Sequence, residues 1–227
     1  MTRGGLTPQA VAVSRAIHSM QAHGVLPALP LDPKRKAILR HARKTFVREG
    51  YAATRIEPIA REAGVSTATL YALFEGKAQL FAAVIRDAAE DFALQMARLG
   101  AIEGDARQQL TSFAAAYAEF MSDPFVRSVF RLVMAERPRF QAVAIRFFED
   151  GRKAFGATLI TILIAQSKAG ALKPIDHPSW AAGNLMGMIE HPVFFVPLVT
   201  GDEVKVRRTI TEIVEDAVAT FLARYGA

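Results

Sequence analysis

Seven cationic side chains lie close together near the start of this 227-residue chain, and they bind anions by charge. They occur between residues 33 and 48, a stretch with no Asp or Glu: Lys34, Arg35, Lys36, Arg40, Arg43, Lys44 and Arg48. A solvated helix face usually mixes both signs of charge. Through residue 80 the chain has 12 Lys and Arg against 5 Asp and Glu, whereas residues 81–227 have 16 against 17. This localised charge favours binding to the phosphates of nucleic acid.

The residues that follow have the pattern of a short helix. Thr54 and Glu57 have the spacing of a capping box, so a helix is expected to start near Arg55. Apolar residues then recur at the three-and-four spacing of a buried face: Ile56, Ile59, Ala60 and Ala63. Gly64 provides the left-handed conformation that ends a helix.

A second short helix is predicted directly after Gly64. Val65 is an apolar residue in the turn, and Ser66 is a favourable N-cap. The inner face of the second helix would consist of Leu70, Leu73 and Phe74. Two helices joined by a short turn containing Gly are typical of a helix-turn-helix. The alternative is an ordinary hairpin in an all-helical core.

The run ILRHARKTFVREGYAATRIEPIAREAGVSTATLYALFEGKAQLFAAVI, residues 38–85, resembles the DNA-binding domain of the TetR (tetracycline-repressor-like) family of bacterial transcription regulators. The positions that carry the resemblance include Phe46, Gly50-Tyr51, Thr54, Ile59-Ala60, Ala63-Gly64-Val65-Ser66, Thr69-Leu70-Tyr71, Phe74, Lys77 and Leu80. The rest of the chain resembles the family only in being helical and of suitable length.

The resemblance implies that residues 66–74 form a recognition helix in the major groove. Thr67 with Tyr71, and Ala68 with Ala72, form outward pairs at helical spacing. Thr and Ala can contact a thymine methyl, and Thr can also hydrogen-bond a base edge. Tyr71 and Lys77 match family positions that contact phosphate. The expected DNA-binding residues are Thr54, Arg55, Ser66, Thr67, Ala68, Thr69, Tyr71, Ala72 and Lys77.

Two features depart from the expected pattern. Pro58 falls at about the fourth position of its helix, so the first turn is expected to be tight or distorted. The recognition helix has no Arg, Lys, Asn or Gln, the side chains that make bidentate contacts with bases. Specificity at each half-site is therefore expected to be modest, and dimer spacing, DNA shape and the N-terminal arm gain weight.

Three segments are predicted: an N-terminal extension at 1–32, a helix-turn-helix DNA-binding domain at 33–80, and an effector-binding and dimerisation domain at 81–227. The extension is expected to be an extra helix or a partly disordered tail, since only Arg3 and Arg15 are cationic there. An arm laid along DNA is the alternative. Arg15 and His18 interrupt its apolar run, so a signal peptide is not expected.

An all-α fold is predicted because long amphipathic stretches continue to the end of the chain without an alternating strand pattern. Helices are expected at roughly 77–99, 105–121, 124–135, 140–169, 178–190 and 203–224. The longest uncharged stretch in the 140–169 helix, residues 154–167, is too short to span a bilayer, and no membrane partner is expected. The absence of cysteine agrees with a cytoplasmic protein.

In the TetR family the second domain holds a small-molecule cavity and forms the dimer through its last two long helices. Gly183 and Gly187 would let two helices approach closely. The last helix adds an apolar stripe at three-and-four spacing: Ile210, Ile213, Val214, Ala217 and Phe221. The resemblance implies a four-helix interface between subunits. Packing of the same stripe within one chain is the alternative.

Aromatic and Met residues in the second domain suit a cavity for an apolar or aromatic effector, although most are expected in plain core. The candidates for the cavity are Phe92, Met96, Phe113, Tyr117, Phe120, Phe147 and Trp180. His177, Glu190 and His191 do not have a recognised metal-ligand spacing, so no metal or other cofactor is expected. Pro192 is expected to end or kink its helix.

The resemblance implies a homodimeric repressor that binds a palindromic operator in successive major grooves. A small effector would lower operator affinity by favouring a state with wrongly spaced heads, with the helix that starts at Lys77 as transmitter. The alternatives are a non-specific DNA-compacting protein and an all-helical carrier of hydrophobic ligands. No cysteine nucleophile, glycine-rich phosphate loop or paired-carboxylate motif nominates an active site, so an enzyme is not expected.

Overall fold

The structure is a computed structural model that describes residues 32–97, 103–201 and 207–227, with the side chains of residues 96 and 97 left out. Within these ranges the regular elements are helices. A backbone bridge between Leu172 and Gly226 ties the end of α11 (Ile210–Tyr225) to the loop after a long helix. The predicted all-α class is confirmed. The prediction for the N-terminal extension falls on residues 1–31, outside the described residues, and on Asp32.

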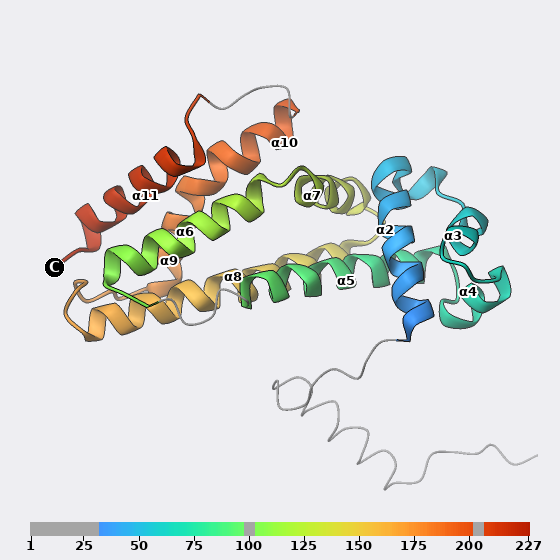
Figure 1. Ribbon diagram of the computed structural model, residues 1–227, viewed down its shortest axis with the longest axis horizontal. Coiled ribbons are helices and arrows are strands. Elements are labelled where there is room, and N and C mark those ends of the chain that lie inside the picture. The colour runs from blue at the N-terminus through green and yellow to red at the C-terminus, as the bar shows by residue number, and fades with distance from the viewer. Residues whose placement is uncertain (1–31, 98–102, 202–206) are drawn as a thin grey trace, which may run out of the picture.

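Three helices form the head of the molecule: α2 (Pro33–Ala53), α3 (Ile56–Glu62) and α4 (Thr67–Leu73). The Asp32 side chain accepts a hydrogen bond from the Lys34 amide at 2.9 Å, which caps α2. Gly50 has φ of 74° and interrupts the helical backbone near the end of α2. Figure 1 shows α2 crossing the end of α5, with α3 and α4 on the far side of α2.

The remaining helices form a larger bundle: α5 (Lys77–Ala97), α6 (Ala106–Ser122), α7 (Pro124–Glu136), α8 (Gln141–Lys168), α9 (Pro178–Glu190), the π-helix η1 (His191–Phe195), α10 (Val196–Thr200) and α11 (Ile210–Tyr225). Helix α5 packs along α8, and α11 packs on α6 (Figure 1). Helix α9 contacts α6, α8 and α11. The last helix begins at Ile210, later than the predicted start at 203, because Thr209 and Glu212 form its capping box.

The helix that contains Pro192 continues past it, so of the two expected outcomes, an end or a kink, the end is wrong. Segments α9, η1 and α10 form one helix of 23 residues from Pro178 to Thr200. The Val196 amide donates to the His191 carbonyl five residues earlier, and this wider turn accommodates a proline that has no amide hydrogen. By length and composition this helix could cross a membrane. This is weak evidence for a membrane span, because core helices of soluble proteins pass the same test.

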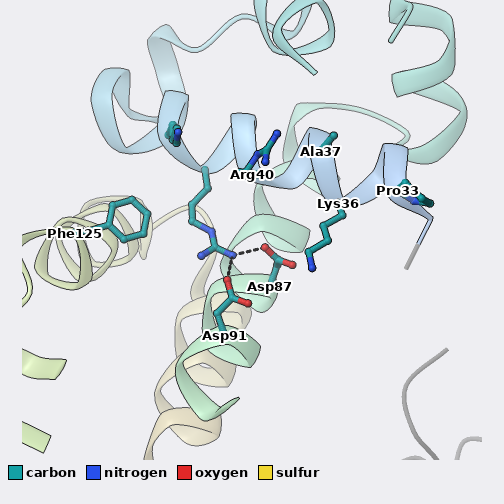
Figure 2. Close-up of a pocket in the computed structure, with 9 residues that line it drawn as sticks. Pro33, Lys36, Ala37, Arg40, Asp87, Asp91 and Phe125 are labelled. Atoms are coloured by element: carbon teal, nitrogen blue, oxygen red, sulfur yellow. Dashed lines mark hydrogen bonds and ion pairs between the residues drawn. The ribbon is translucent and has the colours of Figure 1, made fainter. Parts of the chain in front are cut away.

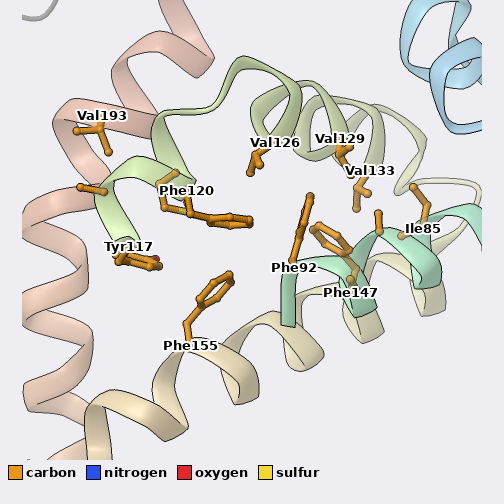
Figure 3. Packing of buried hydrophobic residues seen from close by; sticks show 14 of the residues in the cluster. Ile85, Phe92, Tyr117, Phe120, Val126, Val129, Val133, Phe147, Phe155 and Val193 are labelled. Atoms are coloured by element: carbon orange, nitrogen blue, oxygen red, sulfur yellow. The ribbon is translucent and has the colours of Figure 1, made fainter. Parts of the chain in front are cut away.

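Aromatic side chains join the head to the bundle. The ring of Phe81 on α5 lies 5.3 Å from the rings of both Phe46 and Tyr51 on α2. Phe140, just before α8, lies 4.7 Å from Phe81 and 4.9 Å from Tyr51. Further into the bundle, rings from α5, α6 and α8 converge on one another (Figure 3). The head is therefore packed on α5 through a shared hydrophobic core.

Candidate nucleic-acid interface and effector cavity

The turn between α3 and α4 has the geometry that the sequence predicts. Gly64 has φ of 70°, and the Val65 amide donates to the Ala60 carbonyl at 3.0 Å, which closes α3. The Ser66 hydroxyl accepts a hydrogen bond from the Thr69 amide at 3.0 Å, which caps α4. The predicted helix, turn and second helix are confirmed.

Thr54 corrects two parts of the prediction. Its hydroxyl donates to the Gly50 carbonyl at 2.6 Å, and the residue is 2% exposed. Arg55 is the N-cap of α3 and makes no side-chain cap hydrogen bond, so the capping box between Thr54 and Glu57 is absent. Thr54 cannot present its side chain to DNA in this structure, because the hydroxyl closes the end of α2. Arg55 is exposed.

Pro58 also differs from the prediction. It is the third residue of α3, counting from Ile56. The first amides of a helix have no intrahelical acceptor, so proline at this position removes no hydrogen bond. Pro58 therefore does not require the first turn to be distorted.

The outer face of α4 is open at the end of the molecule (Figure 1). Thr67, Ala68, Tyr71 and Ala72 are exposed, and Thr69 is half-buried. On the inner face, Leu70 is 0% exposed and anchors α4 against the head. The Ser66 and Thr69 hydroxyls lie 2.9 Å apart, whereas the hydroxyl-bearing residues Thr67 and Tyr71 of α4 are exposed. This face is therefore accessible from outside the protein.

Lys77 binds the protein itself. Its ammonium donates to the carbonyls of Ala52 and Thr54, each at 3.0 Å, and lies 4.7 Å from the centre of the Tyr51 ring. An ammonium has three donors, so most of its capacity is engaged at the end of α2. Lys77 thereby ties the start of α5 to α2, and its contact with phosphate stays a prediction.

The cations of α2 differ in exposure and partners, although Lys36, Arg40 and Lys44 line the same groove as Arg43. Lys34, Lys36, Arg40 and Lys44 are exposed. Arg43 instead points to α5, where it forms ion pairs with Asp87 and, at 2.8 Å, with Asp91 (Figure 2). These three groups lie in a groove of about 500 Å³ between α2, α5 and Phe125 of α7. Arg43 therefore joins the head to the bundle, which its place in a run of cations does not reveal.

A second cavity, of about 410 Å³, lies in the bundle among α5, α6, α7, α8, α9 and η1. Three predicted residues line it: Phe92, Tyr117 and Phe147. Two others lie in the core beside it. Phe113 stacks on Tyr117 with the ring centres 5.9 Å apart, and Phe120 lies 4.9 Å from Phe92.

Trp180 is not part of the cavity, which corrects that prediction. It is 73% exposed near the start of α9, with its ring 4.9 Å from that of His177. The Met96 side chain lies outside the described residues. Further lining residues were absent from the predicted set: Ala89, Met121, Phe130, Phe148, Gly151, Arg152, Phe155, Gly183, Met186, Glu190 and Phe194. One face of α8 lines the cavity at four-residue steps, Phe147–Gly151–Phe155 and Phe148–Arg152. This spacing in the sequence could have predicted these lining residues.

Tyr117 and Glu190 form the main polar feature of the cavity wall. The Tyr117 hydroxyl donates to the Glu190 carboxylate. Burial raises the pKa of Tyr117 well above its usual range, and the negative charge of Glu190 and the hydrogen bond to it add to the rise. Tyr117 therefore stays protonated and remains the donor. Most other lining residues are apolar, apart from exposed Arg152.

The predicted subunit interface on α11 is corrected by burial within the chain. Ile213, Val214, Ala217 and Phe221 are each 5% exposed or less, and α11 packs on α6 and α9. Ile210 is half-buried against the same core. These side chains follow the alternative of packing inside one chain, because α6 and α9 already cover their face.

The predicted glycines lie on an open face. Gly183 and Gly187 are exposed, and beyond the adjoining residues and backbone of their own helix nothing lies within 4 Å of a Cβ built on either glycine. Large apolar side chains are exposed along the same helix and its continuation: Trp180 at 73%, Phe195 at 53% and Val199 at 68%. Gly183 also lines the cavity.

Sequence profiles of two families match the chain. The profile described as bacterial regulatory proteins, tetR family, matches residues 38–84. The profile described as AefR-like transcriptional repressor, C-terminal domain, matches residues 108–227. The first covers the α3–α4 unit with its neighbours, and the second covers most of the cavity wall.

Individual relatives agree with these matches. The HTH-type transcriptional activator FasR of Mycolicibacterium smegmatis is 32% identical over 93 residues, which cover 41% of this chain and 42% of that protein. The match thus spans less than half of the curated relative. A TetR-family regulator of Mesorhizobium loti MAFF303099 is similar in structure, with a TM-score of 0.73, 25% identity, and coverage of 86% of this chain and 97% of that one.

The flavonoid-responsive regulator FrrA has a TM-score of 0.67, 26% identity, and coverage of 85% of this chain and 97% of that one. The profile matches together extend over the head and most of the bundle. This chain therefore belongs to the TetR family of bacterial transcription regulators.

Proposed function

We propose that the protein is a homodimeric cytoplasmic repressor that binds a palindromic operator and is released when a small apolar or aromatic molecule occupies the bundle cavity. The observation that carries the DNA-binding part is the exposed face of α4, with Thr67, Ala68, Tyr71 and Ala72 held on a closed helix-turn-helix. Arg55 and the exposed cations of α2 are the candidates for phosphate contacts.

The direction of regulation rests on family relationships that differ. The C-terminal profile is described as that of a repressor, whereas FasR is described as an activator. The description of the C-terminal profile, which covers more of this chain than the match to FasR, favours repression. Transcription from a promoter with the operator overlapping its start separates the two: repression lowers transcript without ligand, and activation raises it.

A homodimer is supported by the exposed apolar side chains along α9 to α10. Trp180, Phe195 and Val199 face away from the core, and Gly183 and Gly187 leave room for a partner helix. Exposed apolar surface of this kind marks interaction sites, and a symmetric pair would cover it. The face of α11 that would join the interface is its exposed one, which includes residues 219 and 220, an alanine and a threonine.

The cavity is coupled to the head by packed helices. Arg127 on α7 is 5% exposed and donates to the carbonyls of Ser122, at the end of α6, and Val193, in η1 at 3.4 Å. Helix α7 in turn packs on α2. Arg43 joins α2 to Asp87 and Asp91 on α5, whose residue Phe92 lines the cavity. A ligand that moves α5 or η1 therefore acts on α2, with coupling of about 1–3 kcal/mol.

The decisive experiment selects bound sequences from a random DNA pool with the purified protein and then measures affinity for the winner at several salt concentrations. Enrichment of an inverted repeat, with a complex of two chains per site, supports the proposal. Binding without enrichment would favour a non-specific DNA-compacting protein. Ligand binding without salt-dependent DNA affinity would favour a carrier.

An effector screen follows from the shape and lining of the cavity. Its volume of about 410 Å³ lies in the range of small-molecule sites, and its walls are mainly aromatic. FrrA is named as flavonoid-responsive, so planar aromatic compounds are a sensible first library. A compound that binds the protein yet leaves operator affinity unchanged is not an effector, and failure of every binder would refute the coupling.

A further inference from the structure

We infer that the effector has an apolar body with a positively charged, hydrogen-bond-donating head, such as an ammonium, and that the Tyr117–Glu190 pair recognises this head. The inference rests on the proposed function, in which the bundle cavity is the effector site. It names the chemical class of the ligand from the groups that face it.

The Tyr117–Glu190 pair has hydrogen-bond acceptors left for a ligand but no donor. Tyr117 commits its only hydroxyl proton to Glu190. A carboxylate is acceptor-only and has about four lone-pair sites, so one bond from Tyr117 leaves most of its capacity open. The cavity therefore offers acceptors at this point. A ligand head that donates hydrogen bonds satisfies them, whereas a head that only accepts leaves them unpaired.

The surrounding walls favour positive charge. Six phenylalanines line the cavity with the pair: Phe92, Phe130, Phe147, Phe148, Phe155 and Phe194. The face of an aromatic ring carries partial negative charge and attracts a cation within about 6 Å of its centre. A half-buried carboxylate among aromatic rings is screened less than a surface charge. Both features stabilise the same kind of head.

Arg152 is the opposing charge in the cavity. Its side chain is exposed as well as lining the cavity, as is that of Phe148, so both lie at the opening. Solvent weakens its field more than that of half-buried Glu190. An anionic ligand would have to bind at the opening beside Arg152, with its body directed at Glu190. This alternative predicts the opposite preference for charge.

The position of Glu190 also links recognition to the rest of the bundle. Glu190 is the last residue of α9, directly before η1. Within η1, the Val193 carbonyl accepts a hydrogen bond from Arg127 of α7. A ligand head that draws the carboxylate away from Tyr117 acts at the start of the π-turn. The Tyr117–Glu190 contact, which would bind the ligand head, is thus close in sequence to the Val193 carbonyl that bonds to Arg127 of α7.

The test uses four probes with one naphthalene body and different heads. They are 1-naphthylmethylammonium, 1-naphthalenemethanol, 1-methylnaphthalene and 1-naphthoate, titrated calorimetrically or by competition into the purified full chain. We expect the ammonium compound to bind about 10-fold more tightly than the alcohol and about 100-fold more tightly than the carboxylate. This ranking on the unmodified protein requires no variant to fold.

Two variants then assign the preference to the pair. Glu190→Gln keeps an oxygen that accepts from Tyr117 but removes the charge, and we expect it to abolish the preference of about 10-fold for ammonium over alcohol. Glu119→Gln is the matched control, because Glu119 lies on the same helix as Tyr117 but is exposed and outside the cavity lining. Tyr117→Phe should keep the preference for ammonium, since the carboxylate remains.

Equal or tighter binding of 1-naphthoate overturns the inference, as does absence of measurable binding by the ammonium compound. Equal effects of Glu190→Gln and Glu119→Gln overturn it too. Operator affinity measured in parallel by fluorescence anisotropy keeps the two proposals apart. Sequence-specific DNA binding with a preference for the carboxylate refutes the inference alone. Preference for ammonium that depends on Glu190, without any effect on DNA binding, refutes the proposed effector role alone.

Discussion

The head and the bundle cavity distribute their polar groups in opposite ways. The head presents small and hydroxylated side chains at its surface, on the outer face of α4, and anchors them from below with Leu70. The cavity places one hydrogen-bonded pair, Tyr117 and Glu190, in a wall of aromatic rings. An exposed surface spreads binding over many weak contacts, whereas a single polar pair among aromatic rings concentrates the effect of a substitution in single groups.

The largest effect is expected from removing the anchor of the head. Leu70→Ala should lower the free energy of unfolding by about 2–5 kcal/mol, because a fully buried side chain is lost and a cavity remains. Chemical denaturation measures it. Leu94→Ala on α5 is the control, since Leu94 is 59% exposed and its loss should change stability little. Similar effects of both substitutions would show that α4 is not anchored by Leu70.

A substitution on the outer face tests the head without disturbing its anchor. Ala68→Glu should weaken operator binding by about 100-fold, because like charges brought together at an interface cost several kcal/mol. Fluorescence anisotropy with a labelled operator measures the loss. Ala157→Glu on α8 makes the same change at another exposed helical position and should leave binding unchanged. Normal binding by the Ala68 variant would remove α4 from the interface.

One hydroxyl compares the two regions directly. Tyr117→Phe should cost about 1–3 kcal/mol of stability, because it removes a buried donor and leaves Glu190 without that partner. Tyr71→Phe on α4 should cost less than about 0.5 kcal/mol, since Tyr71 is 49% exposed. Thermal unfolding at one pH measures both. If the two variants are equally stable, the cavity does not concentrate its polar interactions as described.

The smallest effect is expected at an exposed cation of the head. Arg55→Ala should weaken binding to specific and random DNA alike and lower the salt slope by about 1, as expected for the loss of one phosphate contact. Lys153→Ala on α8 removes an equivalent exposed charge and should leave the slope unchanged. A change in sequence preference by the Arg55 variant would instead indicate a contact with a base.

Sequence reasoning was accurate where the signals act over a few residues. Gly64 and Ser66 end one helix and begin the next through hydrogen bonds that reach three to five residues along the chain. Sequence reasoning was wrong where two nearby backbone groups competed for the same side chain. The Thr54 hydroxyl had the spacing for a capping box with Glu57, yet it bonds to the Gly50 carbonyl. Whether a threonine hydroxyl accepts from the amide three residues later or donates to the carbonyl four residues earlier cannot be decided from spacing alone.

The contents of the cavity were predicted only in part. Phe92, Tyr117 and Phe147 were expected and line it, whereas Trp180 is exposed. Glu190 was absent from the predicted lining. Phe194 was absent too, because the predicted helix ended at residue 190. An apolar side chain reports that it is to be buried but not against which helix.

The sequence alone determined the helical class, the helix-turn-helix and the family, since caps, turns and periodicity depend on neighbouring residues. The tertiary structure decided how the remaining groups are used. Arg43 pairs with Asp87, 44 residues away, and Tyr117 meets Glu190 across 73 residues. It also decided that the stripe on α11 packs on α6 and α9. Such contacts depend on how helices cross, and a crossing is set by the shape of both partners together.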